Sequence, residues 1–198
     1  MWRRLLVRSD CTIAMLHTIL QVAFGWSDEH LHQFLIRGKP YGIGRIGGII
    51  FDDNPRQVLL RDFHFRPKET FVYEYDLRDL WQHEIRLEQV LLFDPAKQYP
   101  ICIGSKRRGP LEDCGGPWVF MELQDERPQW KAVPKFAQLL LDHQDDLEDH
   151  EEEFRHLAYW VAYETFHPQT VNRRLAEEAT RRREEEGISH AYQGPGPH

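Results

Sequence analysis

The first regular pattern along the chain is a stripe of apolar residues at helical spacing over residues 12–24. The residues that share this stripe are Ile13, Leu16, Leu20, Ala23 and Phe24. Spacings of three and four place them on one face of an α-helix, and Gly25 is suited to end that helix in the left-handed conformation. His17 and Gln21 fall outside the stripe, so we expect both side chains to be exposed.

A second pattern, alternation with a period of two, predicts a β-hairpin over residues 69–92. Its first strand alternates Phe and Tyr with other side chains, as half-buried strands do. The second strand starts at Trp81 and is expected to continue toward Leu92. One face of this second strand consists of Trp81, His83, Ile85 and Leu87. A histidine therefore stands in an otherwise apolar row.

The remaining segments complete an α+β pattern. Residues 31–37 and 99–103 are predicted strands, and the glycines spread over residues 38–48 predict a flexible loop. The last third of the chain is predicted to be helical, with Pro134 in the first turn of a helix that ends near His143. We expect a central antiparallel sheet that contains the hairpin, one N-terminal helix packed on it, and C-terminal helices.

Composition and charge fit a single globular domain without a nucleic-acid footprint. The chain has 198 residues, 41% of them hydrophobic, which is enough to bury one core. Its formal net charge is −7, yet eight acidic residues lie between Asp142 and Glu153, and without them about +1 remains. Strong binding to duplex DNA is therefore not expected. The acidic stretch is interpreted as a solvated linker and helix start.

Cysteine usage and hydropathy indicate a cytoplasmic protein. Cys11, Cys102 and Cys114 are an odd number without disulfide or paired zinc spacing, so reduced thiols are expected. The sequence contains no run of about 18 apolar residues, so no transmembrane helix is predicted and no membrane partner is expected. The basic and apolar start of the chain is interrupted by Arg8 too early for a signal peptide.

Four carboxylates on two predicted turns are the candidate catalytic groups. Asp76 and Asp79 lie in the hairpin turn, Glu112 and Asp113 lie in a later turn, and His83 follows the first pair. Converging oxygen ligands would suit Mg²⁺ or Mn²⁺, and a histidine beside them would suit metal-assisted hydrolysis. The favoured interpretation is that the aspartates shape their turns by hydrogen bonding to their own backbone, and the metal site is the alternative. No cofactor is expected, and a divalent metal is possible.

The candidate binding residues are Trp81, His83, Gly115 and Gly116, which the hairpin and the later turn would bring to one surface. His83 has a second interpretation, because most buried polar groups are simply paired with a neighbour. A satisfied structural imidazole is therefore the favoured interpretation of His83, and a ligand is the alternative.

Two weaker metal patterns involve other residues. His83, Cys102 and Cys114, with His30 or His32, offer four zinc ligands, but their spacing matches no standard zinc site, and no metal is expected there. In a strand, His30 and His32 would share a face and could hold a metal together.

Several motifs occur together in an order that resembles one known family. They are Trp2-Arg3-Arg4, Phe24-Gly25-Trp26, His30-Leu31-His32, Tyr73-Glu74-Tyr75-Asp76 with Asp79, Trp81 and His83, and Glu112-Asp113-Cys114-Gly115-Gly116. From Trp2 to about Leu175 the chain resembles the plasmid pRiA4b ORF-3-like family. The resemblance implies a single α+β domain over residues 1–175. Residues 176–198 are predicted from their own composition to form a charged helical extension and then, from Ile188 onward, a disordered tail.

The chain departs from this family in ways that bear on function. Leu77-Arg78 fills the hairpin turn where a glycine is usual, which implies a different turn conformation. The family also has a strand before Trp2. Either the gene start is truncated or an edge strand is left open, and an open N-terminal edge would favour self-association.

The family has no settled activity, although some members carry a resolvase label from mobile elements. A serine resolvase needs an activated serine and clustered arginines, and the sequence shows no such set. The leading interpretation is a small cytoplasmic binding or accessory protein, associated with mobile elements by resemblance only. The alternative is a metal-dependent hydrolase or nuclease that uses Asp76, Asp79, His83, Glu112 and Asp113.

Overall fold

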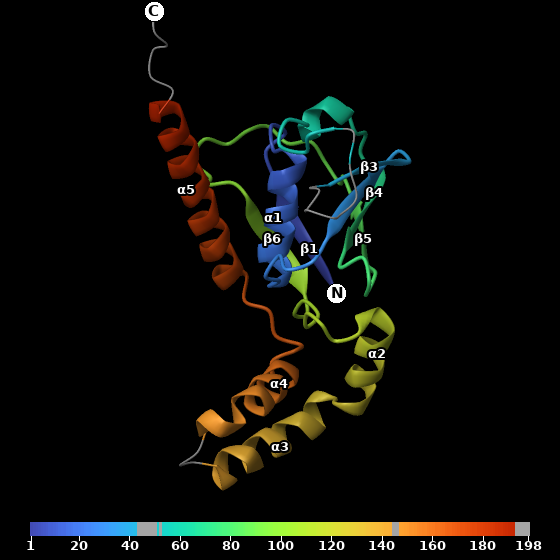
Figure 1. Cartoon of the computed structure of the whole chain (residues 1–198), viewed down its shortest axis with the longest axis vertical. Coiled ribbons are helices and arrows are strands. Elements are labelled where there is room, and N and C mark those ends of the chain that lie inside the picture. The colour runs from blue at the N-terminus through green and yellow to red at the C-terminus, as the bar shows by residue number, and fades with distance from the viewer. Residues whose placement is uncertain (43–50, 52, 144–146, 193–198) are drawn as a thin grey trace, which may run out of the picture.

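The computed structural model describes residues 1–42, 51, 53–143 and 147–192, and it has the α+β fold that the sequence predicts (Figure 1). The strands are β1 (Trp2–Leu6), β2 (His32–Ile36), β3 (Lys39–Tyr41), β4 (Thr70–Tyr75), β5 (Trp81–Arg86) and β6 (Ile101–Lys106). The α-helices are α1 (Ile13–Phe24), α2 (Gly116–Glu126), α3 (Gln129–Asp142), α4 (Glu151–Val161) and α5 (Pro168–Tyr192). Two 3₁₀ turns are η1 (Leu60–Phe63) and η2 (Leu147–His150).

The strands form two antiparallel sheets. One has four strands in the order β3-β2-β4-β5, and the other pairs β1 with β6. In the larger sheet, Tyr75 lies opposite His32 on β2 and opposite Trp81 on β5. The predicted hairpin is present, but its second strand ends at Arg86 instead of running toward Leu92. Its partner β4 begins at Thr70, opposite Arg86, and the backbone hydrogen bonds between the two segments end one residue later, with those of Leu87 to Glu69 and Lys68.

Helix α1 confirms the predicted N-terminal helix and its glycine end. Gly25 has a φ of 85°, and its N–H donates to the carbonyl of Gln21. The expectation that His17 and Gln21 are exposed was wrong, because both side chains are buried, at 2% and 3% exposure. Their face of α1 lies against β4, where both side chains meet the hydroxyl of Tyr73.

The smaller sheet is fastened to the C-terminal helix. Asn172 on α5 accepts from the backbone N–H of Cys102 and donates to its carbonyl, so one amide side chain docks the helix on β6. Strand β1 pairs with β6 alone within the described part of the chain, and its register shifts between Arg4 and Leu5. Such irregularities disrupt the regular spacing that an added strand would need.

Helices α2, α3 and α4 extend away from the strands at one end of the molecule (Figure 1). The ring of Phe136 on α3 meets that of Phe154 on α4 edge-on, at 5.9 Å. Pro134 lies inside α3 and not in its first turn, because the helix begins five residues earlier than the sequence indicates. Pro134 is exposed, so the carbonyl that it leaves without an intrahelical partner can bond to water.

Other expectations fall at the margins of the described chain. The predicted loop over residues 38–48 contains β3, which forms a short hairpin with β2, while residues 43–50 lie outside the described residues. Helix α5 extends to Tyr192 where a tail was predicted from about residue 188, and residues 193–198 are not described. No helix within the described ranges is both long and apolar enough to span a bilayer.

Candidate functional site

Two groups of histidine and aspartate side chains lie beside the ring of Tyr75, at the end of β4. One group, which we call the His30 cluster, consists of His30, Asp76 and Asp113. The other, the His17 cluster, consists of His17, Asp28 and His32. In each group one ligand atom per residue lies within 4.8 Å of the others. Both groups hold the residue types that bind divalent metals in proteins.

In the His30 cluster, the imidazole stands between two carboxylates. His30 Nε2 lies 3.0 Å from Asp113 Oδ1, and His30 Nδ1 lies 3.9 Å from Asp76 Oδ2. Nε2 is buried, and its contact with Asp113 has the distance of an ion pair without the geometry of a hydrogen bond. Asp76 is buried, whereas Asp113 is 60% exposed, so the cluster opens to solvent on the Asp113 side.

The backbone places both aspartates by adopting the left-handed conformation. Asp76 has a φ of 51° and Asp113 a φ of 56°, values that few residues other than glycine, Asn and Asp adopt. Asp76 Oδ1 accepts the N–H groups of Arg78 and Asp79, which fixes the carboxylate and turns its Oδ2 toward His30. The predicted turn-shaping role and the predicted cluster therefore use different oxygens of one side chain.

A second contact ties the two turns together. Asp79 Oδ2 accepts the backbone N–H of Gly115 at 3.1 Å, which brings the loop of Asp113 against the hairpin turn. Gly116 has a φ of 84°, and a Cβ at this position would lie 2.6 Å from the carbonyl oxygen of Asp79. The loop is thus held in place by Asp79, Gly115 and Gly116, and none of these three residues belongs to the His30 cluster.

Glu112 is held by hydrogen bonds on the other side of the same loop. Its Oε2 accepts both the N–H (2.9 Å) and the hydroxyl (2.7 Å) of Ser27, and its Oε1 accepts the hydroxyl of Tyr75 at 2.5 Å. Burial is the main cause that raises the pKa of the Tyr75 hydroxyl, and the hydrogen bond to the charged Glu112 carboxylate raises this pKa further. Glu112 therefore anchors the loop that carries Asp113.

The His17 cluster is organised as a closed ring of hydrogen bonds. Asp28 N–H donates to Gln21 Oε1 at 3.0 Å, and Gln21 Nε2 donates to Tyr73 Oη at 2.9 Å. With Gln21 so oriented, the Tyr73 hydroxyl can donate to His17 Nδ1 at 2.8 Å. His17 Nε2–H then donates to Asp28 Oδ1, also at 2.8 Å. Every member of the ring both donates and accepts.

Stacking makes the His17 cluster a poor metal site. The rings of His17 and His32 lie face to face, with centroids 3.4 Å apart and planes 6° from parallel. An imidazole binds a metal along a nitrogen lone pair, which lies in the plane of the ring. Two parallel planes share no point, so one ion cannot lie in the plane of both rings unless one of them turns.

His83 lies in the aromatic core and not with the carboxylates. Its ring is 4.5 Å from Phe24 and 5.3 Å from Trp26, measured between centroids. Burial lowers its pKa from 6.5 to about 4, so the imidazole is neutral at pH 7. No metal-sized group of ligands in the described part of the chain includes His83. Trp81 is buried as well, with its ring against Phe120.

The cysteine candidates also lie apart from the cluster. Cys102 and Cys114 belong to no group of three ligands among the described residues, and all three cysteines of the chain are free thiols. Burial raises the pKa of both thiols, that of Cys114 to about 11, so both stay protonated at pH 7. A thiol in that state is a weak ligand and a weak nucleophile.

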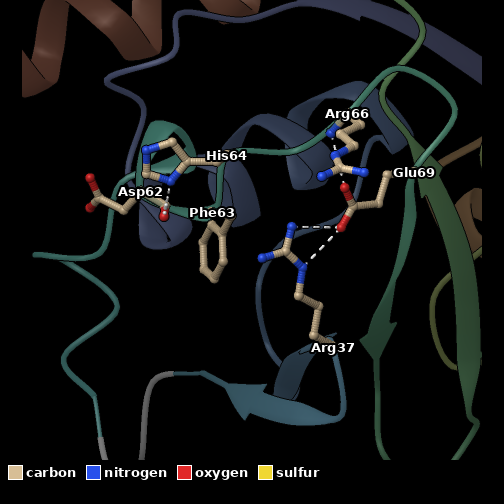
Figure 2. Close-up of a pocket in the computed structure, with 6 residues that line it drawn as sticks. All are labelled: Arg37, Asp62, Phe63, His64, Arg66 and Glu69. Atoms are coloured by element: carbon tan, nitrogen blue, oxygen red, sulfur yellow. Dashed lines mark hydrogen bonds and ion pairs between the residues drawn. The ribbon is translucent and has the colours of Figure 1, made fainter.

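A separate open hollow of about 550 Å³ lies where η1 and the start of β4 meet the end of β2 (Figure 2). Its lining residues are Arg37, Asp62, Phe63, His64, Arg66 and Glu69. Glu69 accepts two hydrogen bonds from the Arg37 guanidinium and one from the backbone of Arg66. The lining contains two guanidinium groups and two carboxylates, so it does not favour a ligand of either charge.

The sequence pointed to part of the His30 cluster. Convergence of the two acidic turns was one of two alternatives, and in the structure Asp76 and Asp113 do lie in one group. The imidazole of that group comes from His30 and not from His83. His30 and His32 were considered as a pair on one strand face, but β2 begins at His32 and each joins a different cluster. His30 could have been found from its position just before β2, because β2 pairs with the end of β4, where Asp76 follows.

The fold and the His30 cluster define a small α+β protein with an imidazole–carboxylate site on the loops at one end of its larger sheet. The chain belongs to the plasmid pRiA4b ORF-3-like family, whose model matches residues 1–175.

Two further proteins are similar to this chain. "Uncharacterized protein y4hQ" from Sinorhizobium fredii (strain NBRC 101917 / NGR234) is 32% identical over 123 residues, which are 61% of this chain and 62% of that relative. The crystal structure of MM3350, a protein of unknown function from Methanosarcina mazei Go1, is 29% identical with a TM-score of 0.59. That match covers 85% of this chain and 87% of the other.

Proposed function

We propose that this protein binds one divalent transition-metal ion at the His30 cluster. The observation that carries the proposal is the His30 imidazole, which lies between the carboxylates of Asp76 and Asp113 and whose buried Nε2, 3.0 Å from Asp113 Oδ1, makes no hydrogen bond. Ligands that lie about 2.1 Å from a shared ion are roughly 3–3.5 Å apart. A separation within 4.8 Å therefore needs only small side-chain movements.

The ligand set indicates the kind of ion. One imidazole and two carboxylates suit Zn²⁺ or Mn²⁺ better than Ca²⁺ or Mg²⁺, which prefer oxygen ligands throughout. Asp113 is the exposed member, so an ion would enter from its side and keep at least one position for water or a small ligand. The two carboxylates would balance the two positive charges of the ion.

Binding, and not hydrolysis, is the function that the surroundings support. Hydrolysis at a metal needs a general base near the bound water. Glu112, the acidic neighbour of Asp113, already accepts hydrogen bonds from Ser27 and Tyr75. Its carboxylate is therefore used to hold the loop.

The cytoplasm is the compartment that we propose for this protein. Its cysteines are free thiols, two of them buried, and reduced thiols are typical of cytoplasmic proteins. An accessory role for a mobile element rests on family resemblance alone. Self-association through β1 stays a prediction, and the irregular register of that strand counts against it.

Calorimetric titration of the metal-free protein with Zn²⁺ and with Mn²⁺ tests the proposal. We expect one ion per chain, and an affinity at least about tenfold lower in Asp113→Asn, which loses one ligand charge. Asp94→Asn is the matched control, because Asp94 is also an exposed loop aspartate but pairs with Lys97. A wild-type chain that takes up neither ion would refute the proposal.

A further inference from the structure

Tyr75, the last residue of β4, has a side chain that is completely buried beside the His30 cluster. Its exposed fraction is 0%, and the ring of Trp26 stacks on it with the centroids 4.7 Å apart. The ring of His30 meets it edge-on, at 5.8 Å. Packing therefore holds the Tyr75 ring in one place, and the position of its hydroxyl is fixed with it.

The hydroxyl of Tyr75 joins two loops that are distant in the sequence. It donates to Glu112 Oε1 at 2.5 Å, and backbone groups of Glu29 and His30 hydrogen-bond to its oxygen. A phenolic hydroxyl can both donate and accept, and here it does both. Burial is the main cause that raises the pKa of Tyr75, so the proton stays on the phenolic oxygen at pH 7 and Glu112 is the acceptor.

Each of the three proposed metal ligands lies within one residue of Tyr75 or of one of its hydrogen-bond partners. Asp76 follows Tyr75 directly in the chain, and Asp113 follows Glu112. The backbone of His30 is itself bonded to the hydroxyl. The relative positions of the three ligand segments therefore depend on one side chain.

Glu112 closes this arrangement from the other side. Its Oε2 accepts the N–H and the hydroxyl of Ser27, at 2.9 and 2.7 Å. Ser27 lies only three residues before His30, so the segment of His30 is tied to the segment of Asp113 twice, through Ser27 and through Tyr75. Two ties hold the ligands close more firmly than either tie alone.

We propose that Tyr75 is a positioning residue of the metal site, whose hydroxyl holds His30, Asp76 and Asp113 close together before an ion arrives. The proposal rests on the proposed function and states what sets the affinity of the site. Ligands that are already in place lose less conformational freedom when the ion binds. Removal of a side chain that orients metal ligands typically lowers metal affinity by about 10–100-fold.

Tyr75→Phe, which removes the hydroxyl and keeps the ring, tests the proposal in the full chain. We expect the Zn²⁺ affinity of the metal-free protein, measured by calorimetric titration, to fall at least about tenfold. Tyr73→Phe is the matched control, because Tyr73 is equally buried on the same strand and its hydroxyl bonds to His17 and Gln21. The control should be less stable than the wild type and should keep the wild-type affinity. An affinity that fell equally in both variants would overturn the positioning role.

Bound Co²⁺ distinguishes a positioning residue from a ligand, because its visible absorption reports the ligands and their geometry. At saturation, Tyr75→Phe should give the wild-type spectrum, since the ion keeps all three ligands. Asp113→Asn, which changes a ligand, should give a different spectrum. An altered spectrum in Tyr75→Phe would overturn the proposed positioning role.

Amide hydrogen exchange without metal separates failure of this proposal from failure of the metal site. In Tyr75→Phe the amide protons of Glu29 and His30 should exchange faster while those of β2 do not, whereas in Tyr73→Phe any acceleration should be shared by both. A wild type that takes up no ion would refute the metal site, and the exchange rates would then decide alone whether Tyr75 holds the segments together. Unchanged affinity in Tyr75→Phe, with a wild type that binds Zn²⁺, would overturn the positioning role alone.

Discussion

The His17 and His30 clusters are built from the same residue types beside the same tyrosine ring, yet they differ in what their hydrogen bonds leave available. In the His17 cluster, both nitrogens of His17 meet neighbours at 2.8 Å, and a second imidazole covers its face. In the His30 cluster, Nε2 meets a carboxylate without a hydrogen bond. Residue type alone therefore does not define a metal site. The hydrogen bonds that the side chains already make decide which cluster can bind a metal ion.

The largest expected effect comes from opening the ring at Tyr73. Tyr73→Phe removes the hydroxyl that His17 Nδ1 and Gln21 Nε2 share, and leaves two buried polar atoms without a partner. At about 1–3 kcal/mol for each such atom, we expect the free energy of unfolding to fall by about 3 kcal/mol. Urea denaturation measures this change. His30→Ala is the comparison. It should lower the free energy of unfolding by less than about 1 kcal/mol, because His30 is not part of a closed ring of hydrogen bonds.

His83 extends the comparison to a histidine that is enclosed by aromatic side chains. Its pKa is about 4 in the folded chain and 6.5 by reference, so the unfolded chain takes up the proton first as the pH falls. Stability due to the neutral imidazole is present above pH 6.5 and is lost between pH 6.5 and 4. The loss should approach about 3 kcal/mol at pH 4.

Denaturation curves of the wild type and His83→Leu at several pH values isolate this contribution, because other groups titrate equally in both proteins. The difference between the two stabilities should change in favour of the variant below pH 6.5. A difference that does not vary with pH would show that His83 is not the neutral, enclosed imidazole described above.

Gly116→Ala tests how the loop of the His30 cluster is held. The substitution places a Cβ 2.6 Å from the carbonyl oxygen of Asp79, at a φ of 84°. We expect a loss of about 2 kcal/mol in thermal or urea unfolding, together with weaker metal binding. Gly38→Ala is the control, because Gly38 has a similar φ of 80° and no heavy atom within 4 Å of a new Cβ. Equal losses in both variants would mean that the contact with Asp79 does not matter.

The smallest expected effect on stability comes from Asp76→Asn. An amide oxygen can still accept from the N–H groups of Arg78 and Asp79, and Asn tolerates the left-handed backbone. We expect a change in the free energy of unfolding below about 1 kcal/mol, while metal affinity falls at least about tenfold. Calorimetry and urea denaturation on one preparation separate the two effects. If metal affinity and the free energy of unfolding fell together to a similar extent, the role of Asp76 would be purely structural.

Local patterns in the sequence predicted the elements that depend on near neighbours. Helix α1 and its end at Gly25 follow from spacing and glycine chemistry, and the hairpin of β4 and β5 follows from alternation. The end of β5 was predicted too late, since apolar residues continue to residue 93 in the sequence whereas the partner strand β4 begins at Thr70, opposite Arg86. Helix α2 carried no clear periodic signal of its own.

The clusters could be predicted only in part, because their members come from distant segments. His17 was expected to be exposed, since the hydroxyl that pairs it belongs to Tyr73, 56 residues later. Convergence of the turns that carry Asp76 and Asp113 was only one of two alternatives that the sequence left open. The choice of His30 over His83 depends on which face of β5 packs against Phe24 and Trp26, which only the tertiary structure determines.

The central claim is that the His30 cluster, and not the His17 cluster, takes the metal ion. The most direct test is to follow the imidazole NMR signals of all histidines while metal-free protein is titrated with Zn²⁺ up to one equivalent. The account predicts that the signals of His30 shift as the ion binds while those of His17 and His32 stay in place. Movement of the His17 and His32 signals in place of His30, or no movement of any histidine, would contradict it.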